Sequence, residues 1–356
     1  MDMVDEPTVS DRASGLPLLR RHRRVAITLA VFGALILIVV TIPSHGSSSQ
    51  QQSAPPARPS ASAAESSGLA RTVACQLHSI KFRSAHSPQV QLPLTGLGQP
   101  KAVAVDSAGN VYVADYFTNR VLKLPTGSNT PVELPFTGLI GPNGVALDAA
   151  SNVYVTDFGN SRVLELRAGS DTPVELPFSG LQGLGGLAVD CTGNVYVIDS
   201  FMNRMGSMIS RVLELPAGSK TPVELPFTDL TEPTGLAVDS AGTVYVADGD
   251  KQVLKLAAGS NTQVGLPSFG QGRPTGLAVD NVGNLYITDD TNRVLKLPWW
   301  GTPVELRFTG LQRPVAVAVD SVGNIYVADD SNRVLKAPWW ETPVDLRFTG
   351  LKGPKP

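Results

Sequence analysis

The amino-acid sequence predicts an all-β protein, a six-bladed β-propeller preceded by one transmembrane helix. Three observations lead to this prediction. From Pro100 onward a unit of roughly 40 residues occurs six times. Each unit holds four short runs rich in Val, Leu and Tyr, and one uncharged segment of 18 residues stands near the N-terminus. Repeats that each supply four antiparallel strands are typical of propeller blades.

The uncharged segment covers residues 25–42. A helix of that length spans about 27 Å, which suffices for a bilayer core. Arginines crowd its N-terminal side, and no basic residue follows until Arg58. By the positive-inside rule, residues 1–24 form a short cytoplasmic tail and the rest lies outside the cell membrane, anchored by a single pass. A cleaved signal peptide stays open as the alternative.

Residues 43–87 are mostly Ser, Ala, Pro and Gln, so they have little apolar surface to bury and should form a flexible tether. The propeller is expected over residues 88–356. In its first unit the runs AVAVD, NVYVAD, RVLKL and PVELPF alternate with period two, which predicts four strands. Turn residues such as Gly and Asn separate these runs.

The repeat is marked by the aspartate that ends each AVD-like triplet, with spacings of 42, 42, 49, 41 and 40 residues: Asp106, Asp148, Asp190, Asp239, Asp280 and Asp320. Closure of the ring has two solutions. Residues 89–94 copy the fourth strand ahead of the first unit, and the last unit has its own fourth strand at residues 343–348. The sequence does not decide which of them pairs with the last blade.

Composition argues against several functions. The net charge of −2 disfavours binding to nucleic acid, because phosphates are met by basic patches. All four histidines precede residue 88, so the repeats lack the imidazole ligand and the usual general base. The repeated carboxylates are interpreted as structural, because a residue needed once per catalytic site has no reason to recur in every blade. We therefore expect no enzyme, no cofactor and no metal. A carboxylate-only Ca²⁺ site in the channel stays open.

The unit GLAVDxxGNxYVxDxxxNRVLKL resembles the NHL repeat. LPFTGL, VYVAD, NRVLKL and AGSxT make residues 88–356 closely similar to the extracytoplasmic sensor domain of the mycobacterial Ser/Thr protein kinase D, without its kinase domain. This resemblance implies an actinobacterial sensor or scaffold that binds a protein, peptide or cell-wall ligand outside the membrane. Some NHL-like propellers are metal-dependent enzymes of the lyase or lactonase type, and this class is the alternative function.

Binding sites are expected where units break their own pattern. Seven extra residues of the third unit fall in a loop at residues 200–210, which carries Met202, Met205 and Met208. Thioethers suit adaptable contact surfaces. A neutral insertion in a surface loop is the alternative.

The same face of the predicted ring should carry two further groups. One is a set of aromatic residues between the second and third strands: Tyr116, Phe117, Phe158 and Phe201. The other is a ring around the channel mouth: Lys101, Asn143, Thr234 and Thr275. Grouped exposed aromatics favour an interaction patch. Packing of the aromatics onto their own loops is the alternative.

On the opposite face, two tryptophan doublets replace the AGS turn: Trp299, Trp300, Trp339 and Trp340. They are expected to pack on the outer edge of their blades or to meet a partner. Export also permits a disulfide between Cys75 and Cys191.

Overall fold

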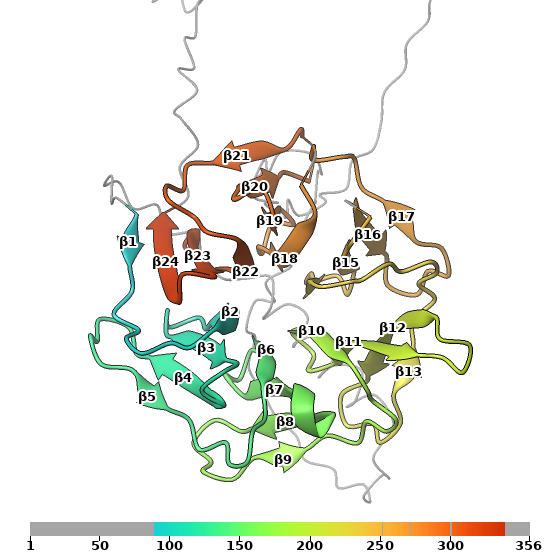
Figure 1. The fold of residues 1–356 in the computed structure, drawn as a ribbon, viewed down its shortest axis with the longest axis horizontal. Helices are drawn as coiled ribbons and strands as arrows, with labels where there is room; N and C mark the ends of the chain where they lie inside the picture. Colours follow the sequence, from blue (N-terminus) through green and yellow to red (C-terminus); the bar gives the residue numbers. More distant parts are fainter. Residues whose placement is uncertain (1–88, 251, 271, 300, 339–356) are drawn as a thin grey trace, which may run out of the picture. The chain divides into compact units, whose positions relative to one another are not determined.

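The fold is a six-bladed β-propeller, as the sequence predicts (Figure 1). The computed structural model describes residues 89–338, apart from residues 251, 271 and 300. Within these residues the strands form six four-stranded antiparallel sheets, arranged around a central channel. The first strand of each blade lies at the channel, and the last strand lies at the rim.

Blades 1 to 3 contain these strands, in order from the channel outward: β2 (Pro100–Val105), β3 (Val111–Asp115), β4 (Arg120–Leu124) and β5 (Val132–Glu133); β6 (Pro142–Leu147), β7 (Val153–Asp157), β8 (Arg162–Leu166) and β9 (Val174–Glu175); β10 (Leu184–Val189), β11 (Val195–Met202), β12 (Met208–Leu215) and β13 (Val223–Glu224).

Blades 4 to 6 contain, in the same order: β14 (Leu236–Val238), β15 (Val244–Asp248), β16 (Gln252–Leu256) and β17 (Val264–Gly265); β18 (Pro274–Val279), β19 (Leu285–Asp289), β20 (Val294–Leu297) and β21 (Val304–Leu306); β22 (Pro314–Val319), β23 (Asn324–Asp329), β24 (Arg333–Pro338) and β1 (Val90–Gln91).

The core lies between neighbouring blades. Six clusters of buried apolar residues each combine side chains of two adjacent sheets; for example, Val113 of β3 packs in one cluster with Tyr326 of β23. Four of the second strands, β3, β7, β15 and β19, are buried along their whole length, and β11 and β23 are buried over five residues each. A sheet buried on both faces explains why these strands read as continuous apolar runs. Each fully buried Val or Leu contributes roughly 1.5–3 kcal/mol to folding.

The ring is closed by the segment that precedes the first unit. Val90 and Gln91 pair with Lys336 and Leu335 of β24, and the Leu92 amide donates to the Val334 carbonyl at 2.9 Å. The question that the sequence left open is thus answered in favour of residues 89–94. The competing segment at residues 343–348 lies outside the described residues.

The seven-residue insertion in blade 3 is not a loop, and this part of the sequence prediction is wrong. It lengthens β11 and β12 into a hairpin that ends in the turn at residues 203–207. The Asn203 side-chain oxygen accepts the amides of Met205 and Ser207, each at 2.9 Å, and Gly206 takes a positive φ of 80°. An Asn and a Gly at these positions favour a turn over an open loop.

The described residues contain one short 3₁₀ helix, η1 (Phe158–Asn160). Among them, no helix is long and apolar enough to cross a bilayer. The predicted tail, anchor and tether, at residues 1–24, 25–42 and 43–87, lie outside the described part of the chain. The transmembrane helix therefore stays a prediction.

Candidate binding face

One face of the propeller, here called the upper face, carries the connections from the second to the third strand and those from the fourth strand to the next blade. The four residues predicted to ring the channel mouth lie together there, around a small cavity of about 80 Å³: Lys101, Asn143, Thr234 and Thr275. Lys101, Asn143 and Thr275 are the second residues of the first strands of their blades. Thr234 is the equivalent residue of blade 4, where the first strand begins two residues later. The repeat therefore brings four positions far apart in sequence to one opening.

Three of these four side chains link neighbouring blades. Asn143 donates to the Leu184 carbonyl at 2.5 Å, and Thr275 donates to the Pro314 carbonyl at 2.6 Å. Thr234 donates to the Pro274 carbonyl at 3.1 Å. The bonds of Asn143 and Thr275 connect the first strand of one blade to that of the next, and the bond of Thr234 connects the chain just before β14 to β18.

The backbone at these positions allows the bonds to form. In blades 2 and 5 the register between the first and second strands shifts at this point. Such a bulge turns a side chain out of the regular alternation of the strand. Lys101 is the charged member of the ring and is half-buried.

The aromatic residues of blades 1 and 2 form one cluster. The ring centre of Tyr116 lies 5.4 Å from that of Phe117 and 6.4 Å from that of Phe158. Gly141 allows this packing, because a Cβ there would lie 2.7 Å from the Tyr116 ring. Phe117 nevertheless keeps 68% of its surface exposed. Phe201 lies elsewhere: the guanidinium of Arg211 sits 5.1 Å from its ring centre.

The blade 3 hairpin adds exposed apolar side chains to the same face. Met205 at its tip is 91% exposed, and Met202 and Met208 are exposed as an opposed pair. Ile140 and Ile209 are exposed as well, and sequence reasoning missed both. For Ile140 the signal was available, because the equivalent position of the other units is Gly, Gln or Thr.

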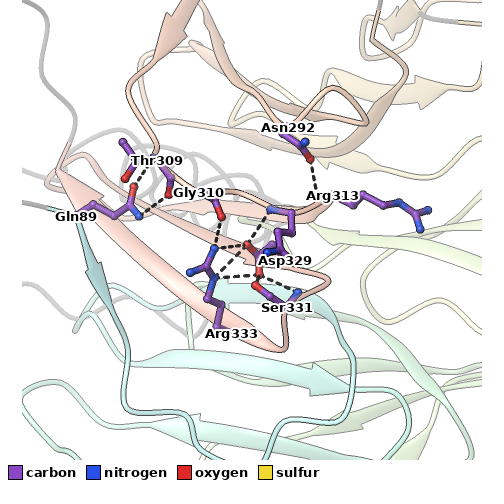
Figure 2. Close-up of polar contacts among 9 residues, drawn as sticks. Gln89, Asn292, Thr309, Gly310, Arg313, Asp329, Ser331 and Arg333 are labelled. Carbon is purple, nitrogen blue, oxygen red and sulfur yellow. Dashed lines mark hydrogen bonds and ion pairs between the residues drawn. The ribbon is translucent and has the colours of Figure 1, made fainter.

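The repeated aspartates serve the fold, as predicted. Asp106 accepts the amides of Ala108 and Asn110, the side-chain amide of Asn110 and the Tyr112 hydroxyl, the last at 3.0 Å. At the end of the second strand of blade 6, the Asp329 carboxylate accepts hydrogen bonds from the Ser331 hydroxyl, the Gln312 backbone amide and the Arg333 guanidinium (Figure 2).

At the opposite end of the channel, three of these aspartates approach a cavity of about 160 Å³: Asp106, Asp280 and Asp320. Their oxygens already accept bonds from turn amides, asparagines and tyrosines. In the part of the chain that the structure describes, no group of three or more His, Cys, Asp or Glu residues could hold a metal ion. The donor set therefore does not fit the Ca²⁺ site of the alternative function.

Burial perturbs the titration of several groups. It raises the pKa of five blade tyrosines, and the neighbouring aspartate adds to the rise: Tyr112, Tyr154, Tyr196, Tyr245 and Tyr326. Burial also raises the pKa of Asp248. The tyrosines thus remain protonated hydrogen-bond donors at neutral pH.

The remaining predicted residues are only partly described. Trp299 lies in the turn after β20 and is 63% exposed. Trp300, Trp339 and Trp340 lie outside the described residues, as does Cys75. Cys191 is half-buried in the turn between β10 and β11 of blade 3. The disulfide and the edge packing of the tryptophans stay predictions.

Among the comparisons with known proteins, only the search of solved structures found similar proteins. No family model matches the chain, and no curated protein matches it. A gluconolactonase from Xanthomonas campestris superposes with a TM-score of 0.57 at 18% identity, over 72% of this chain and 98% of that one. The virginiamycin B lyase of Staphylococcus aureus gives 0.53 at 11% identity, over 71% and 99%. A chain of a nidogen/laminin complex gives 0.52 at 22% identity, over 59% and 82%.

These likenesses establish the six-bladed propeller. They also correct the expectation that the chain is not an enzyme. Two of the three neighbours are a lactonase and a lyase, so this fold gives no ground for excluding catalysis. The finer resemblance to a kinase sensor domain stays a prediction.

Proposed function

We propose that the propeller binds a protein or peptide partner on its upper face and acts as a sensor or scaffold module, held outside the membrane by residues 25–42. The exposed apolar side chains of blades 1 to 3 carry this proposal: Phe117, Ile140, Phe158, Met202, Met205, Met208 and Ile209. Apolar groups gathered on one face are typical of interaction sites, where aromatic residues and Met are enriched. The likeness to a chain of a nidogen/laminin complex agrees with this role.

The other half of the upper face has a different character. In the equivalent connections of blades 4 to 6, Arg273 pairs with Glu232 at 3.4 Å, and Arg313 pairs with Asp330 at 3.4 Å. Such exposed ion pairs keep a surface solvated and contribute little to stability. This contrast supports blades 1 to 3 as the proposed site of the partner.

The test uses peptides selected from a displayed random library on the purified residues 88–356. The variant Phe117→Ser/Phe158→Ser/Met205→Ser should lower the affinity of the selected peptides at least about tenfold, because hot-spot residues cost more than ~1 kcal/mol each. The control is Val282→Ser/Val322→Ser, which removes two valines of similar exposure from turns on the opposite face. An equal loss of affinity in both variants would contradict the proposal. An unchanged affinity in Phe117→Ser/Phe158→Ser/Met205→Ser would contradict it as well.

A second candidate is a lyase or lactonase activity at the channel mouth. The gluconolactonase and the virginiamycin B lyase support it, together with the cation, hydroxyl and amide groups around the cavity of about 80 Å³. Among the described residues, the carboxylates, histidines and cysteines form no group that fits a metal ion, so this candidate includes no metal-dependent step. Lys101 supplies a positive charge at this cavity, and a cation is one kind of group that stabilises the oxyanion of such a reaction.

The assay for this candidate follows ring opening of gluconolactone and cleavage of quinupristin by residues 88–356. Turnover that Lys101→Ala abolishes, and that Val282→Ser/Val322→Ser leaves unchanged, supports the activity. Absence of turnover of both compounds overturns it for these substrates.

A further inference from the structure

The hairpin of blade 3 has an unpaired edge on its outer side. β12 is eight residues long, but its outer neighbour β13 pairs with it only at Leu213 and Glu214. The last bond on this side runs from the Leu225 amide to the Val212 carbonyl at 2.9 Å. Residues 208–210 therefore have β11 on one side, and no strand of the described part of the chain on the other.

The direction of the backbone groups on this edge follows from one bond in the hairpin. The Asn203 amide donates to the Ser207 carbonyl at 2.9 Å. Because bonding to a neighbour alternates along an antiparallel strand, Ile209 also bonds to β11. The N–H and C=O groups of Met208 and Ser210 thus point outward, and no partner for them lies among the described residues.

The opposite edge of the hairpin, on β11, offers less. There the Ser200 amide already donates to the Gly183 carbonyl at 2.9 Å. Of the described residues on this edge, Met202 alone keeps both backbone groups free of a neighbouring strand. The outer edge of β12 is therefore the longer of the two open edges.

The regular outer edges of the blades are protected against such pairing. Their outermost strands are only two or three residues long, and four of them read Pro-Val-Glu, at residues 131–133, 173–175, 222–224 and 303–305. Short strands, prolines and charges on an edge keep other chains from pairing with it. The hairpin has no proline, and its one charged residue, Arg204, lies in the turn. Its edge therefore lacks the protection that the blades have.

The side chains beside this edge are apolar on both faces of the hairpin. Met208 lies opposite Met202 on one face, and Ile209 lies opposite Phe201 on the other. Met208 and Ile209 are 56% and 39% exposed. A strand added beside β12 would place its alternate side chains next to these two pairs. The edge thus fits an extended segment that carries apolar residues on both of its faces.

We infer that the partner of the upper face binds through an extended segment, which adds a strand to the outer edge of β12 at residues 208–210. The inference rests on the proposed function and names the class of partner that suits it. An extended main chain can bond to the N–H and C=O groups of both outward residues at once, because its own groups repeat with the spacing of a strand. The paired part of the segment contains no proline, since proline has no amide to donate.

Hydrogen exchange of the full chain, measured at single amides, tests the contact. The probe is a peptide selected on the protein from a displayed random library. The amides of Met208 and Ser210 should exchange at least about tenfold more slowly in the complex than in the free protein. The Ile209 amide, which bonds to β11, should change little. Unchanged exchange of Met208 and Ser210, in a complex that protects other residues of the upper face, overturns the inference and leaves the proposed function standing.

The same measurement distinguishes a second copy of the chain from a partner. Free protein at increasing concentration is the control. If the Met208 and Ser210 amides become slower in exchange as the concentration of the protein alone rises, a second copy fills the edge, and the inference of a partner's strand is wrong.

Methylation of single amides of the selected peptide separates main-chain pairing from side-chain contact. The affinity should fall at least about tenfold when a paired amide is methylated, because a carbonyl of β12 then lacks its donor. The amides between the paired ones point away from β12, so their methylation should have a much smaller effect. A loss that does not alternate along the peptide contradicts pairing with an edge.

A proline on the edge gives the matching test in the protein. Ser210→Pro removes an outward amide and keeps the bonds between β12 and β11. Ser210→Ala is the matched control, because both variants lose the contact of 2.9 Å between the hydroxyls of Ser200 and Ser210. The affinity should be at least about tenfold lower in Ser210→Pro than in Ser210→Ala. Slow exchange of the Ile209 amide in both variants verifies that the hairpin is intact, and equal affinities then overturn the inference.

Discussion

Gln252 donates its side-chain amide to Asp248 at 3.2 Å, in the place from which an arginine meets the equivalent carboxylate of the five other blades. In blade 5, for example, Arg293 lies 2.6 Å from Asp289. Asp248 is fully buried. Blade 4 thus holds a buried carboxylate with a neutral partner, whereas its neighbours hold ion pairs.

Replacement of this glutamine by arginine should stabilise the protein. In Gln252→Arg, a guanidinium would bond the Asp248 carboxylate in the geometry that the other blades use. We expect a gain of about 1 kcal/mol, reduced from the value of a buried pair because such arginines are partly exposed. Urea unfolding of residues 88–356 measures it. The reverse change in blade 5, Arg293→Gln, should lose a comparable amount, and a stabilising Arg293→Gln would contradict the argument.

The same carboxylate predicts a pH dependence. Burial raises the pKa of Asp248 above its ordinary value of 3.8, so the folded protein holds this proton more tightly than the unfolded chain. The stability that this group contributes is present below that value and is lost as pH rises through the raised pKa. The advantage of Asp248→Asn over the wild type should therefore grow from acid to neutral pH. Unfolding free energies at a series of pH values test this, and an advantage that shrinks with rising pH would contradict it.

The tyrosine–aspartate bond of each blade predicts alkaline sensitivity. Burial and the aspartate raise the pKa of Tyr326 above its ordinary value of 10.0, so ionisation favours the unfolded chain. Stability should be complete below about pH 10 and should fall above it. Tyr326→Phe removes the hydroxyl that donates to Asp320 at 3.0 Å and should lower the free energy of unfolding by about 1 kcal/mol near pH 7. Because this variant has no hydroxyl to ionise there, its free energy of unfolding should fall less steeply above about pH 10 than that of the wild type.

The free energy of unfolding is measured at a series of alkaline pH values, and near-ultraviolet absorbance follows the ionisation of tyrosine at the same pH values. Tyr116→Phe, in the surface cluster of blades 1 and 2, is the control. An identical loss of stability at alkaline pH in Tyr326→Phe and in the wild type would contradict the explanation.

Much of the fold was predictable because each blade repeats the same local signals. Short runs rich in Val, Leu and Tyr between turn residues mark the strands, and the spacing of the aspartates marks the blades. The bond between Tyr112 and Asp106 was also within reach, because an Asp and a Tyr six residues apart recur in every unit. Residues that appear once per blade are interpreted correctly as structural.

Other features depend on contacts that no single unit encodes. The choice of β1 for the edge of blade 6 was not predictable, because residues 89–94 and 343–348 both resemble the fourth strand of a unit. The amide pair of Gln89 with Thr309 joins residues 220 positions apart. The hairpin form of the blade 3 insertion depends on which side chains pair across it. Phe201 is not part of the aromatic cluster, because its ring packs against the Arg211 guanidinium on the same face of the hairpin.

The bonds between blades at the channel mouth make a further prediction. Thr275→Val keeps the shape of the side chain but leaves the Pro314 carbonyl without the donor that lies 2.6 Å away. The loss of this bond should cost about 1–2 kcal/mol. Thr234→Val removes a longer bond, 3.1 Å, from an exposed residue and should cost less. Thermal unfolding of the two variants compares them, and the opposite order would show that the channel bonds do not hold the blades together.

The hairpin of blade 3 should be required for binding and dispensable for folding. Residues 200–210 can be replaced by the four residues that join the same strands in blade 2, Phe158–Ser161, which shortens the chain by the seven extra residues. The unfolding free energy should change by no more than about 1 kcal/mol, because the hairpin tip is exposed and its strands pair mainly with each other. Affinity for the selected peptides should fall at least about tenfold, because Met202, Met205 and Met208 are removed together. Calorimetry and peptide titration of the same preparation separate the two effects. Retained affinity would confine the binding site to the aromatic cluster of blades 1 and 2, and a large loss of stability would show that the hairpin supports the fold.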